Sequence, residues 1–139
     1  MMGTYILFLE SGRDLKPEIG KLGKIKIDKG LYAYVGSAMG KSVNLENRVR
    51  RHQELARSKK GKKQWHIDYF TTAKGVDVTG VVRITGKAIE CEAAKLMGKS
   101  GGRLIAKGFG SSDCKCKTHF FGITEKVAES FLRKLPDLF

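Results

Sequence analysis

Residues 34–52 read YVGSAMGKSVNLENRVRRH, and within them the chain passes from a strand to a helix. The stretch opens on Tyr-Val-Gly, an aromatic strand end, and Asn44 has a side chain of the kind that caps the N-terminus of a helix. We expect this helix to run from about residue 45 to residue 57. Arg48 and His52 lie four residues apart, so they share one stripe of the helix. A tyrosine at a strand end therefore precedes a strongly basic helix.

Three strand-like segments precede this helix, and the last of them contains the Tyr-Val-Gly. TYILFLE at residues 4–10 and LYAYVG at residues 31–36 are rich in aromatic and apolar residues. KIKID at residues 24–28 alternates apolar with charged side chains, and the Asp-Lys-Gly that ends it is typical of a turn. Three strands so close in sequence predict a small, mainly antiparallel three-stranded sheet.

The remainder of the chain predicts helices and shorter strands. The expected elements are a strand at 78–84, a helix at 88–97, a strand within 103–109 and a helix from Thr124 to about residue 135. QWHIDYF at residues 64–70 fits a short helix or a strand. The expected fold class is α+β, with a central sheet flanked by helices and an extra C-terminal strand or loop followed by a helix.

The composition indicates a small basic protein. Its 139 residues fit one domain, and its net charge of +13 favours a polyanion such as nucleic acid as partner. A lysine-rich surface of the kind found in heat-stable proteins is the alternative. The three cysteines predict no disulfide framework, and we find neither a signal peptide nor an apolar run long enough to cross a membrane. We therefore expect a reduced, cytoplasmic protein.

Positive charge concentrates between residues 41 and 63. Basic side chains there can neutralise phosphates, and the tryptophan that follows can stack on bases, as in nucleic-acid grooves. The alternative is a solvated surface without a partner. The predicted nucleic-acid contacts are Lys41, Arg50, Arg51, Lys59, Lys60, Lys62, Lys63 and Trp65.

The order of several short motifs resembles the GIY-YIG endonuclease superfamily. Gly3-Thr4-Tyr5 and Tyr34-Val35-Gly36 match its two namesake motifs, and Leu45–His52 and a later helical glutamate match its helical Arg and Glu. The tracts WHIDY at 65–69, ECEAA at 90–94 and GFGSSDCKCKTHFF at 108–121 are similar to a family of small stand-alone GIY-YIG-like proteins. That family also occurs fused to endonuclease III-type proteins and has long been described as having no known function.

The resemblance covers essentially the whole chain and implies a single GIY-YIG-like nuclease domain over residues 1–139. It assigns Tyr34 as the base that takes a proton from water, and Tyr5 as the group that positions the water. Arg48 would clamp the phosphate, and His52 would assist with the phosphate or the leaving group. A tyrosine base needs nearby positive charge to lower its pKa, and Arg48 is the expected source. Purely structural roles for Tyr34 and His52 are the alternatives.

The resemblance also implies one helical glutamate as the metal ligand. Glu90 and Glu92 both qualify and face opposite sides of a helix, and the family pattern of small residues followed by Lys95 favours Glu90. A single carboxylate with several waters suits one Mg²⁺ or Mn²⁺ ion. Superfamily members of the nucleotide-excision type carry a lysine directly after the second motif, whereas this chain has Ser37, as the homing-type members do.

The tract at residues 113–119 offers several potential metal ligands. Cys114 and Cys116 would face the same side of an extended segment. Structural zinc sites usually take two separated ligand pairs, and the second pair would have to come from scattered residues such as Cys91 or His66, which disfavours zinc. The other readings are a wall of the active site, formed by Asp113, His119 and His66, or a loop packed on the core. Asp68, near His66, lines the same cleft or caps a turn.

Three functions follow from these features. The first is a metal-dependent endonuclease that hydrolyses phosphodiester bonds in nucleic acid, DNA ahead of RNA, with selection of nucleic-acid structure in repair or recombination. The second is a nucleic-acid-binding module that keeps the scaffold without turnover. The third is a zinc-binding interaction domain built around the cysteine tract. Only the first requires Tyr34 and Glu90 to act chemically.

Overall fold

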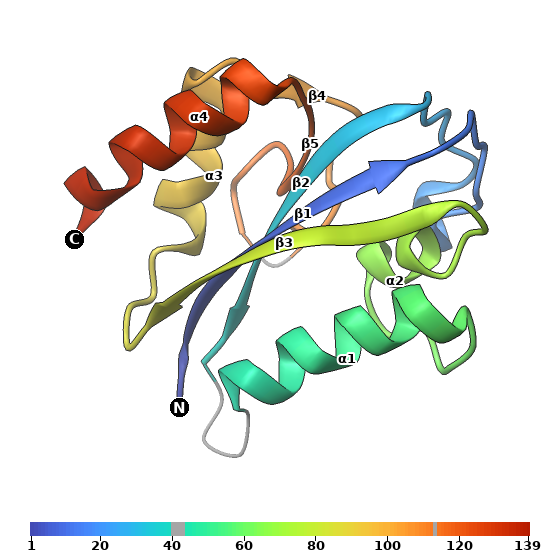
Figure 1. Ribbon diagram of the computed structural model, residues 1–139, viewed down its shortest axis with the longest axis horizontal. Helices are drawn as coiled ribbons and strands as arrows, with labels where there is room; N and C mark the ends of the chain where they lie inside the picture. The colour runs from blue at the N-terminus through green and yellow to red at the C-terminus, as the bar shows by residue number, and fades with distance from the viewer. Residues whose placement is uncertain (40–43, 113) are drawn as a thin grey trace.

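The computed structural model describes residues 1–39, 44–112 and 114–139 (Figure 1). Five strands form one sheet: β1 (Gly3–Ser11), β2 (Gly30–Ala38), β3 (Val76–Thr85), β4 (Arg103–Leu104) and β5 (Phe120–Ile123). Their order across the sheet is β3-β1-β2-β5-β4, and every neighbouring pair is antiparallel. The helices are α1 (Leu45–Ser58), α2 (His66–Thr71), α3 (Glu90–Lys99) and α4 (Glu125–Lys134), with 3-10 turns η1 (Gly20–Leu22) and η2 (Leu135–Leu138).

The predicted α+β class is confirmed, but the three-stranded sheet is not. Residues 24–28 form no strand of the sheet and contribute only the isolated bridges Leu15–Ile27 and Glu18–Lys24. The reason is that β1 already pairs with β2 and β3, and β2 with β1 and β5, so the central strands have no free edge for this segment. Ile27 is nevertheless fully buried, which accounts for the apolar alternation.

The C-terminal half also differs in detail from the expectation. Only Arg103–Leu104 of the predicted strand at 103–109 pairs, and its partner is the short strand β5. Of the two alternatives for residues 64–70, the structure has the helix, α2, which begins at His66. The Asp68 carboxylate stabilises its first turn by accepting hydrogen bonds from the backbone N–H groups of Gln64 and Trp65. The predicted N-caps of α1 and α4 are confirmed: the Asn44 side chain accepts a hydrogen bond from Glu46 N, and the Thr124 side chain accepts one from Val127 N.

Alternating side chains give the sheet two buried faces, and helices cover each (Figure 1). Tyr5, Leu7 and Tyr34 point to the face covered by α1 and α2, where Val49 and Phe70 pack on them. The opposite face packs against α3 and α4 through a second cluster that includes Ile6, Ala33, Val35, Ala93, Met97 and Phe131. The side chains of Tyr5 and Tyr34 therefore lie on the face of the sheet that the basic helix α1 covers.

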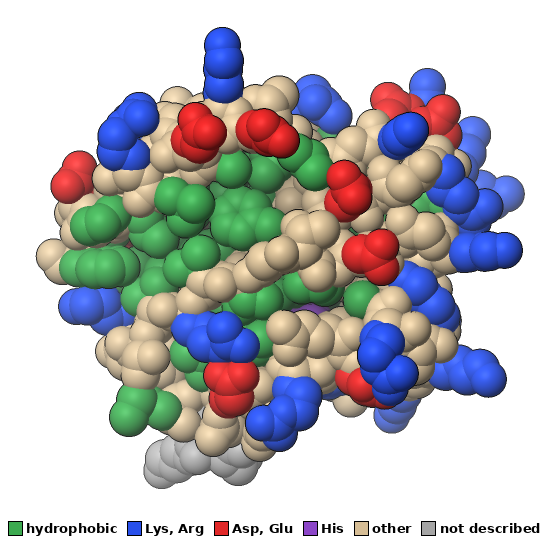
Figure 2. Space-filling model, viewed as in Figure 1, with side chains coloured by type: hydrophobic (Ala, Val, Ile, Leu, Met, Phe, Trp, Pro, Cys, Tyr) green, Lys and Arg blue, Asp and Glu red, His purple; other side chains and the backbone are tan. Residues whose placement is uncertain are grey.

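The surface reflects the excess of positive charge. In Figure 2, Lys and Arg side chains crowd the right-hand side, where Figure 1 shows the segment between β1 and β2 and the loop between α1 and α2. Apolar side chains show on the left of the same view, beside α4. None of the described helices has the length and apolar character needed to cross a membrane.

Candidate active site

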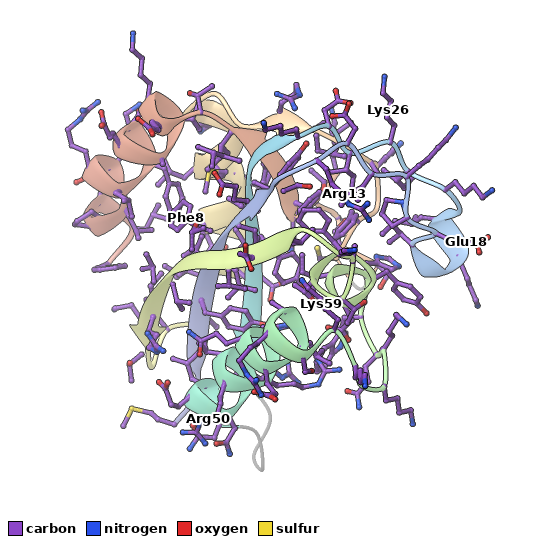
Figure 3. All side chains as sticks on the ribbon, turned by 45° about the vertical axis from the view of Figure 1, so that its right-hand side comes forward. Phe8, Arg13, Glu18, Lys26, Arg50 and Lys59 are labelled. Carbon is purple, nitrogen blue, oxygen red and sulfur yellow. The ribbon has the colours of Figure 1, made fainter. Side chains whose placement is uncertain are left out.

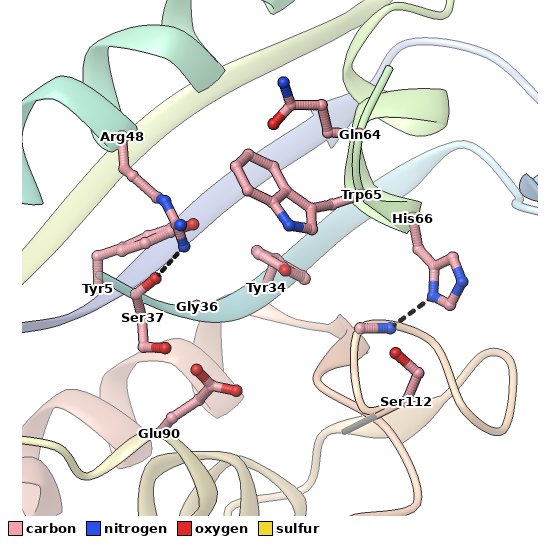
Figure 4. Close-up of a pocket in the computed structure, with 11 residues that line it drawn as sticks. Tyr5, Tyr34, Gly36, Ser37, Arg48, Gln64, Trp65, His66, Glu90 and Ser112 are labelled. Atoms are coloured by element: carbon pink, nitrogen blue, oxygen red, sulfur yellow. Dashed lines mark hydrogen bonds between the residues drawn. The ribbon is translucent and has the colours of Figure 1, made fainter. Parts of the chain in front are cut away.

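A polar cleft of about 290 Å³ opens where β1, β2, α1, α2 and α3 meet (Figure 4). These elements lie far apart in the sequence, so the cleft exists only in the folded chain. Its lining consists of Tyr5, Tyr34, Gly36, Ser37, Arg48, Gln64, Trp65, His66, Glu90, Gly110 and Ser112. The sequence-predicted residues Tyr5, Tyr34, Arg48 and Glu90 are among them, whereas His52 lies directly behind the cleft wall.

The two motif tyrosines are neighbours because β1 and β2 pair in register. Tyr5 is opposite Gly36 and Leu7 is opposite Tyr34, and the two tyrosine ring centroids are 6.5 Å apart. The ring of Tyr5 lies over Gly36: a Cβ atom added there would lie 2.4 Å from Tyr5 Cζ. Glycine at this strand position is therefore what allows the first tyrosine to reach the cleft.

Behind Tyr5, a chain of polar contacts runs into the protein interior. Tyr5 Oη lies 2.7 Å from Nε2 of His52, and His52 Nδ1 lies 3.8 Å from an Asp68 oxygen. Burial lowers the pKa of His52 to about 4, although Asp68 opposes this shift. We assign the proton of the neutral ring to Nδ1, which faces the carboxylate, so that Nε2 accepts the hydrogen bond from the Tyr5 hydroxyl.

Asp68 is the anchor of this chain and engages one of the arginines predicted to bind nucleic acid. The Asp68 side chain is fully buried, and its two oxygens accept from the Arg51 guanidinium at 3.1 and 2.9 Å. Burial would raise the pKa of Asp68, but the hydrogen bonds from Arg51, Gln64 and Trp65 outweigh it and lower the pKa. Asp68 thus caps α2 and supports His52, and Arg51 is held within the protein.

Arg48 comes into the cleft from α1. One of its N–H groups donates to the carbonyl oxygen of Ser37 at 2.5 Å, and its guanidinium lies 4.5 Å from the centre of the Trp65 ring. The Arg51 guanidinium lies 4.6 Å from the centre of the same ring. Trp65 therefore packs against two arginines and forms part of the cleft wall.

Glu90 begins α3 and points into the cleft from the side opposite Arg48 (Figure 4). Its side chain is 23% exposed, and Oε1 lies 2.9 Å from Nδ1 of the fully buried His119. Burial would raise the pKa of Glu90, but contacts with His119 and Ser37, together with the charge of Arg48, outweigh it and lower the pKa. Glu92 is exposed and lies outside this cleft, so Glu90 is the glutamate that faces the tyrosines.

The pKa of Tyr34 is raised, whereas the sequence led us to expect that Arg48 would lower it. Its side chain is only 7% exposed, and burial raises its pKa well above the ordinary value. The neighbouring Tyr5, Glu90 and Asp68 raise it further, and the lowering influence of Arg48 is smaller than each of these. The pKa of Tyr5 is raised for the same main reason. In this structure both tyrosines are therefore neutral hydroxyl groups.

The predicted nucleic-acid contacts divide into engaged and exposed side chains. Lys59 follows α1 and donates from Nζ to the carbonyl oxygens of Thr71 and Val76, so its ammonium group is engaged by the protein in this structure. Arg50 projects from the outer edge of α1, whereas Lys59 lies between α1 and α2 (Figure 3). Lys60, Lys62 and Lys63 are exposed in the segment that leads into Gln64, a residue that lines the cleft, and Lys41 lies outside the described residues.

The predicted wall residues have separate positions. His66 lines the cleft, and its Nδ1 accepts from the backbone N–H of Gly110 at 2.9 Å. His119 lies behind Glu90 instead of on the cleft surface, and Asp113 lies outside the described residues. Sequence reasoning did not assign Ser37, Gln64, Gly110 and Ser112 to the site. Ser37 lies near the end of β2 and the other three lie outside the strands and helices, where no local pattern distinguishes a cleft position from a solvated one.

A second group of functional side chains adjoins the cleft. Cys91, Cys114, Cys116 and His119 each offer a ligand atom, and these atoms all lie within 4.8 Å of one another. Such a group could hold a metal ion. The scattered partner that zinc would need is Cys91, which directly follows Glu90 on α3, whereas His66 is engaged with Gly110. The scattering of the other ligands along the sequence was the reason for disfavouring zinc, and the fold removes that reason by bringing Cys91 and His119 to Cys114 and Cys116.

Comparison with known proteins identifies the chain by family alone. No curated protein and no solved structure matches it significantly. One family matches residues 4–138, which span both tyrosine motifs, the basic helix, Glu90 and the cysteine cluster. Over that length, the chain belongs to the family described as "Domain of unknown function DUF123".

Proposed function

We propose that the protein is a metal-dependent endonuclease of the GIY-YIG type that hydrolyses phosphodiester bonds in nucleic acid, DNA ahead of RNA. The observation that carries the proposal is the convergence of Tyr5, Tyr34, Arg48 and Glu90 on one polar cleft. These residues come from four elements, and the sequence resemblance singles out each of them independently of the structure. A cleft that combines an arginine fork, a carboxylate and two hydroxyl groups suits a phosphate diester.

The cleft residues fit a single divalent cation on Glu90. The carboxylate is ionised, since its pKa is lowered, and it is accessible from the cleft, where one protein oxygen ligand leaves room for several waters. A bound Mg²⁺ or Mn²⁺ would supply positive charge to the phosphate oxygens and to the nearby hydroxyl groups. His119 and Ser37 hold the carboxylate in place from the protein side.

The chain's own groups would divide the remaining work. Arg48 keeps one arm on the Ser37 carbonyl oxygen and directs its other donors at a phosphate. Tyr34 hydrogen-bonds the attacking water, and Tyr5 is held in orientation by His52. Because burial raises the pKa of Tyr34, its role as a proton acceptor requires additional positive charge in the cleft of the loaded enzyme.

The second candidate is a nucleic-acid-binding module without turnover. The observation that favours it is the raised pKa of both tyrosines, since neutral phenols bind phosphates and bases but take no proton. This alternative uses the same exposed lysines and the same arginine. It differs from the nuclease in having no requirement for Glu90.

Cleavage and binding measured in parallel distinguish the two functions. Labelled duplex, branched and single-stranded DNA and RNA are incubated with Mg²⁺ or Mn²⁺ and the wild type, Tyr34→Phe or Glu90→Gln. We expect cleavage by the wild type and a loss of about 10²-fold or more in each variant, with affinity for the substrate changed little. Glu92→Gln is the matched control and should retain the wild-type rate.

The outcomes separate clearly. Cleavage that both substitutions abolish assigns the hydroxyl and the carboxylate to the reaction. Tight, salt-sensitive binding without cleavage of any substrate contradicts the nuclease and favours the binding module. Cleavage that persists in Glu90→Gln and disappears in Glu92→Gln would contradict the cation site described here.

A further inference from the structure

We propose that the protein binds one structural Zn²⁺ ion through Cys91, Cys114, Cys116 and His119. These include all three cysteines of the chain, which meet although Cys91 lies on α3 and the other ligands lie in the segment before β5. Three sulfur atoms and one imidazole nitrogen form the Cys₃His set of structural zinc sites. Soft sulfur ligands select zinc over Mg²⁺, which prefers oxygen.

The distances suit tetrahedral coordination. With Zn–S of about 2.3 Å and Zn–N of about 2.0 Å, a sulfur and a nitrogen ligand of a tetrahedral site lie about 3.5 Å apart, and two sulfurs about 3.8 Å. Cys114 Sγ lies 3.5 Å from His119 Nε2, and all four ligand atoms lie within 4.8 Å of one another. A contraction of about 1 Å at most, which side-chain rotations can supply, completes the site.

The backbone holds the ligands close together. His119 N donates to the Phe109 carbonyl oxygen at 2.9 Å, and Gly108 N donates to that of Lys117 at 2.6 Å. The cysteines remain partly exposed, and a surface groove that reaches both Cys91 and Cys114 provides an entry path for a cation. The described cysteines are all free thiols, as coordination requires.

His119 connects this cluster to the candidate active site. Its ring is fully buried, with Nε2 toward Cys114 and Nδ1 at 2.9 Å from Glu90 Oε1, and Nδ1 has no aligned hydrogen-bond partner among the described residues. Metal ligation through Nε2 places the ring proton on Nδ1, which faces the carboxylate. This is the carboxylate–histidine–zinc arrangement by which outer partners fix a metal-bound imidazole. The same contact makes His119 a positioning residue for Glu90.

Metal content is the direct test, and it does not depend on nuclease activity. The full chain is purified under reducing conditions and its zinc is measured by elemental analysis. We expect about one Zn²⁺ per chain, loss of the metal in Cys114→Ser/Cys116→Ser, and retention in His66→Asn, whose imidazole lies outside the cluster. Chelation of the wild type should lower its Tm, and Zn²⁺ but not Mg²⁺ should restore it.

Cobalt substitution keeps the test valid where a variant folds poorly. Co²⁺ bound to the wild type should show the absorption of a tetrahedral thiolate site, with a charge-transfer intensity about one third lower in Cys91→Ser than in the wild type. Folded, reduced wild type that takes up neither Zn²⁺ nor Co²⁺ overturns the proposal. Retention of zinc by the double serine variant overturns it as well.

The positioning role rests on the proposed function, and His119→Cys tests it separately. This variant offers four thiolates and should retain zinc, but it removes the contact with Glu90. We expect Mn²⁺ binding at Glu90, measured by electron paramagnetic resonance, to weaken about tenfold. Unchanged Mn²⁺ affinity would refute the positioning role alone, and a protein without nuclease activity that still holds zinc would refute only the proposed function.

Discussion

At the scale of single residues, the central feature is a buried polar chain from Tyr5 through His52 to Asp68. A histidine with no exposed surface stays neutral because burial outweighs the nearby carboxylate. Its neutral ring can then accept from Tyr5 and hold that hydroxyl at the cleft. The anchor of the chain is Asp68, whose charge is balanced by Arg51 and by two backbone N–H groups.

The pKa of His52 predicts a decrease in stability at mildly acidic pH. The unfolded chain binds a proton below about pH 6.5, but the folded chain does so only near the His52 pKa of about 4. Between these values the unfolded state binds more protons, so the free energy of unfolding falls as pH falls, by about 3 kcal/mol in total. The rings of Tyr5, Tyr34 and Trp65 pack around His52, Asp68 lies 3.8 Å from its Nδ1, and the charges of Arg51 and Arg48 add to the lowering of its pKa.

Urea unfolding of the wild type and His52→Gln at a series of pH values from about 4 to 7 tests this prediction. Glutamine can still accept from Tyr5 but does not titrate, so the variant should lose most of the pH dependence. His66→Gln is the matched control, since His66 is only partly buried, and it should keep most of the dependence. An equal slope in the wild type and His52→Gln would contradict the assignment.

At the scale of elements, the pairing of β1 with β2 decides whether the tyrosines can meet. The register sets Tyr5 against Gly36, and the absence of a side chain at Gly36 leaves room for the Tyr5 ring. A similar close approach occurs at Gly3, where a Cβ atom would lie 2.4 Å from the Ile84 carbonyl oxygen in β3. Packing within the sheet therefore leaves no room for a side chain at either motif glycine, Gly3 or Gly36.

We predict that Gly36→Ala destabilises the protein by about 1 to 3 kcal/mol, the typical cost of an added core methyl group. It should also displace Tyr5 from His52 and reduce cleavage. Gly98→Ala on α3 is the matched control, because its Cβ would make only an ordinary contact of 3.9 Å with Phe121. In a helix that change should stabilise by about 0.5 to 1 kcal/mol. Thermal and urea unfolding of both variants provide the comparison, and equal stabilities would contradict the packing argument.

At the scale of the whole molecule, charge and architecture combine. The net charge of +13 attracts polyanions generally. The loop between α1 and α2 carries three exposed lysines, Lys60, Lys62 and Lys63 (the rim lysines), directly before Gln64, which lines the cleft. Several basic groups in the same region are engaged with the protein itself, notably Arg51 and Lys59. The number of charges available to nucleic acid is therefore smaller than the sequence indicates.

Removing the rim lysines should weaken nucleic-acid binding more than removing equal charge elsewhere. We compare Lys60→Gln/Lys62→Gln/Lys63→Gln with a control triple variant on α4, on the opposite layer, Lys126→Gln/Arg133→Gln/Lys134→Gln. The rim variant should lose up to about 3 from the slope of log K against log salt for duplex DNA, roughly 0.9 per phosphate contact. Fluorescence anisotropy at several salt concentrations measures both. An equal loss of affinity and of salt dependence in the two variants would contradict this prediction, because it would mean that the position of the charges does not matter.

Local patterns in the sequence determined much of the fold. Asn44 and Thr124 cap α1 and α4 as predicted, and the spacing of Arg48 and His52 put both on the side of α1 that faces the cleft. These features depend on neighbours within one or two helical turns, so a single segment contains the information. The strand character of residues 4–10 and 31–36 is local in the same sense.

Only the tertiary structure decided which groups are engaged and which are accessible. The pairing partners of β1 and β2 excluded residues 24–28 from the sheet, and Arg51 and Lys59 found acceptors far along the chain. Burial set the direction of the pKa shifts of Tyr34 and His52, and the approach of Cys91 to Cys114 completed the cysteine cluster. The physical reason is common to all of these: desolvation and ligand geometry depend on contacts between distant segments, which no local pattern of residues specifies.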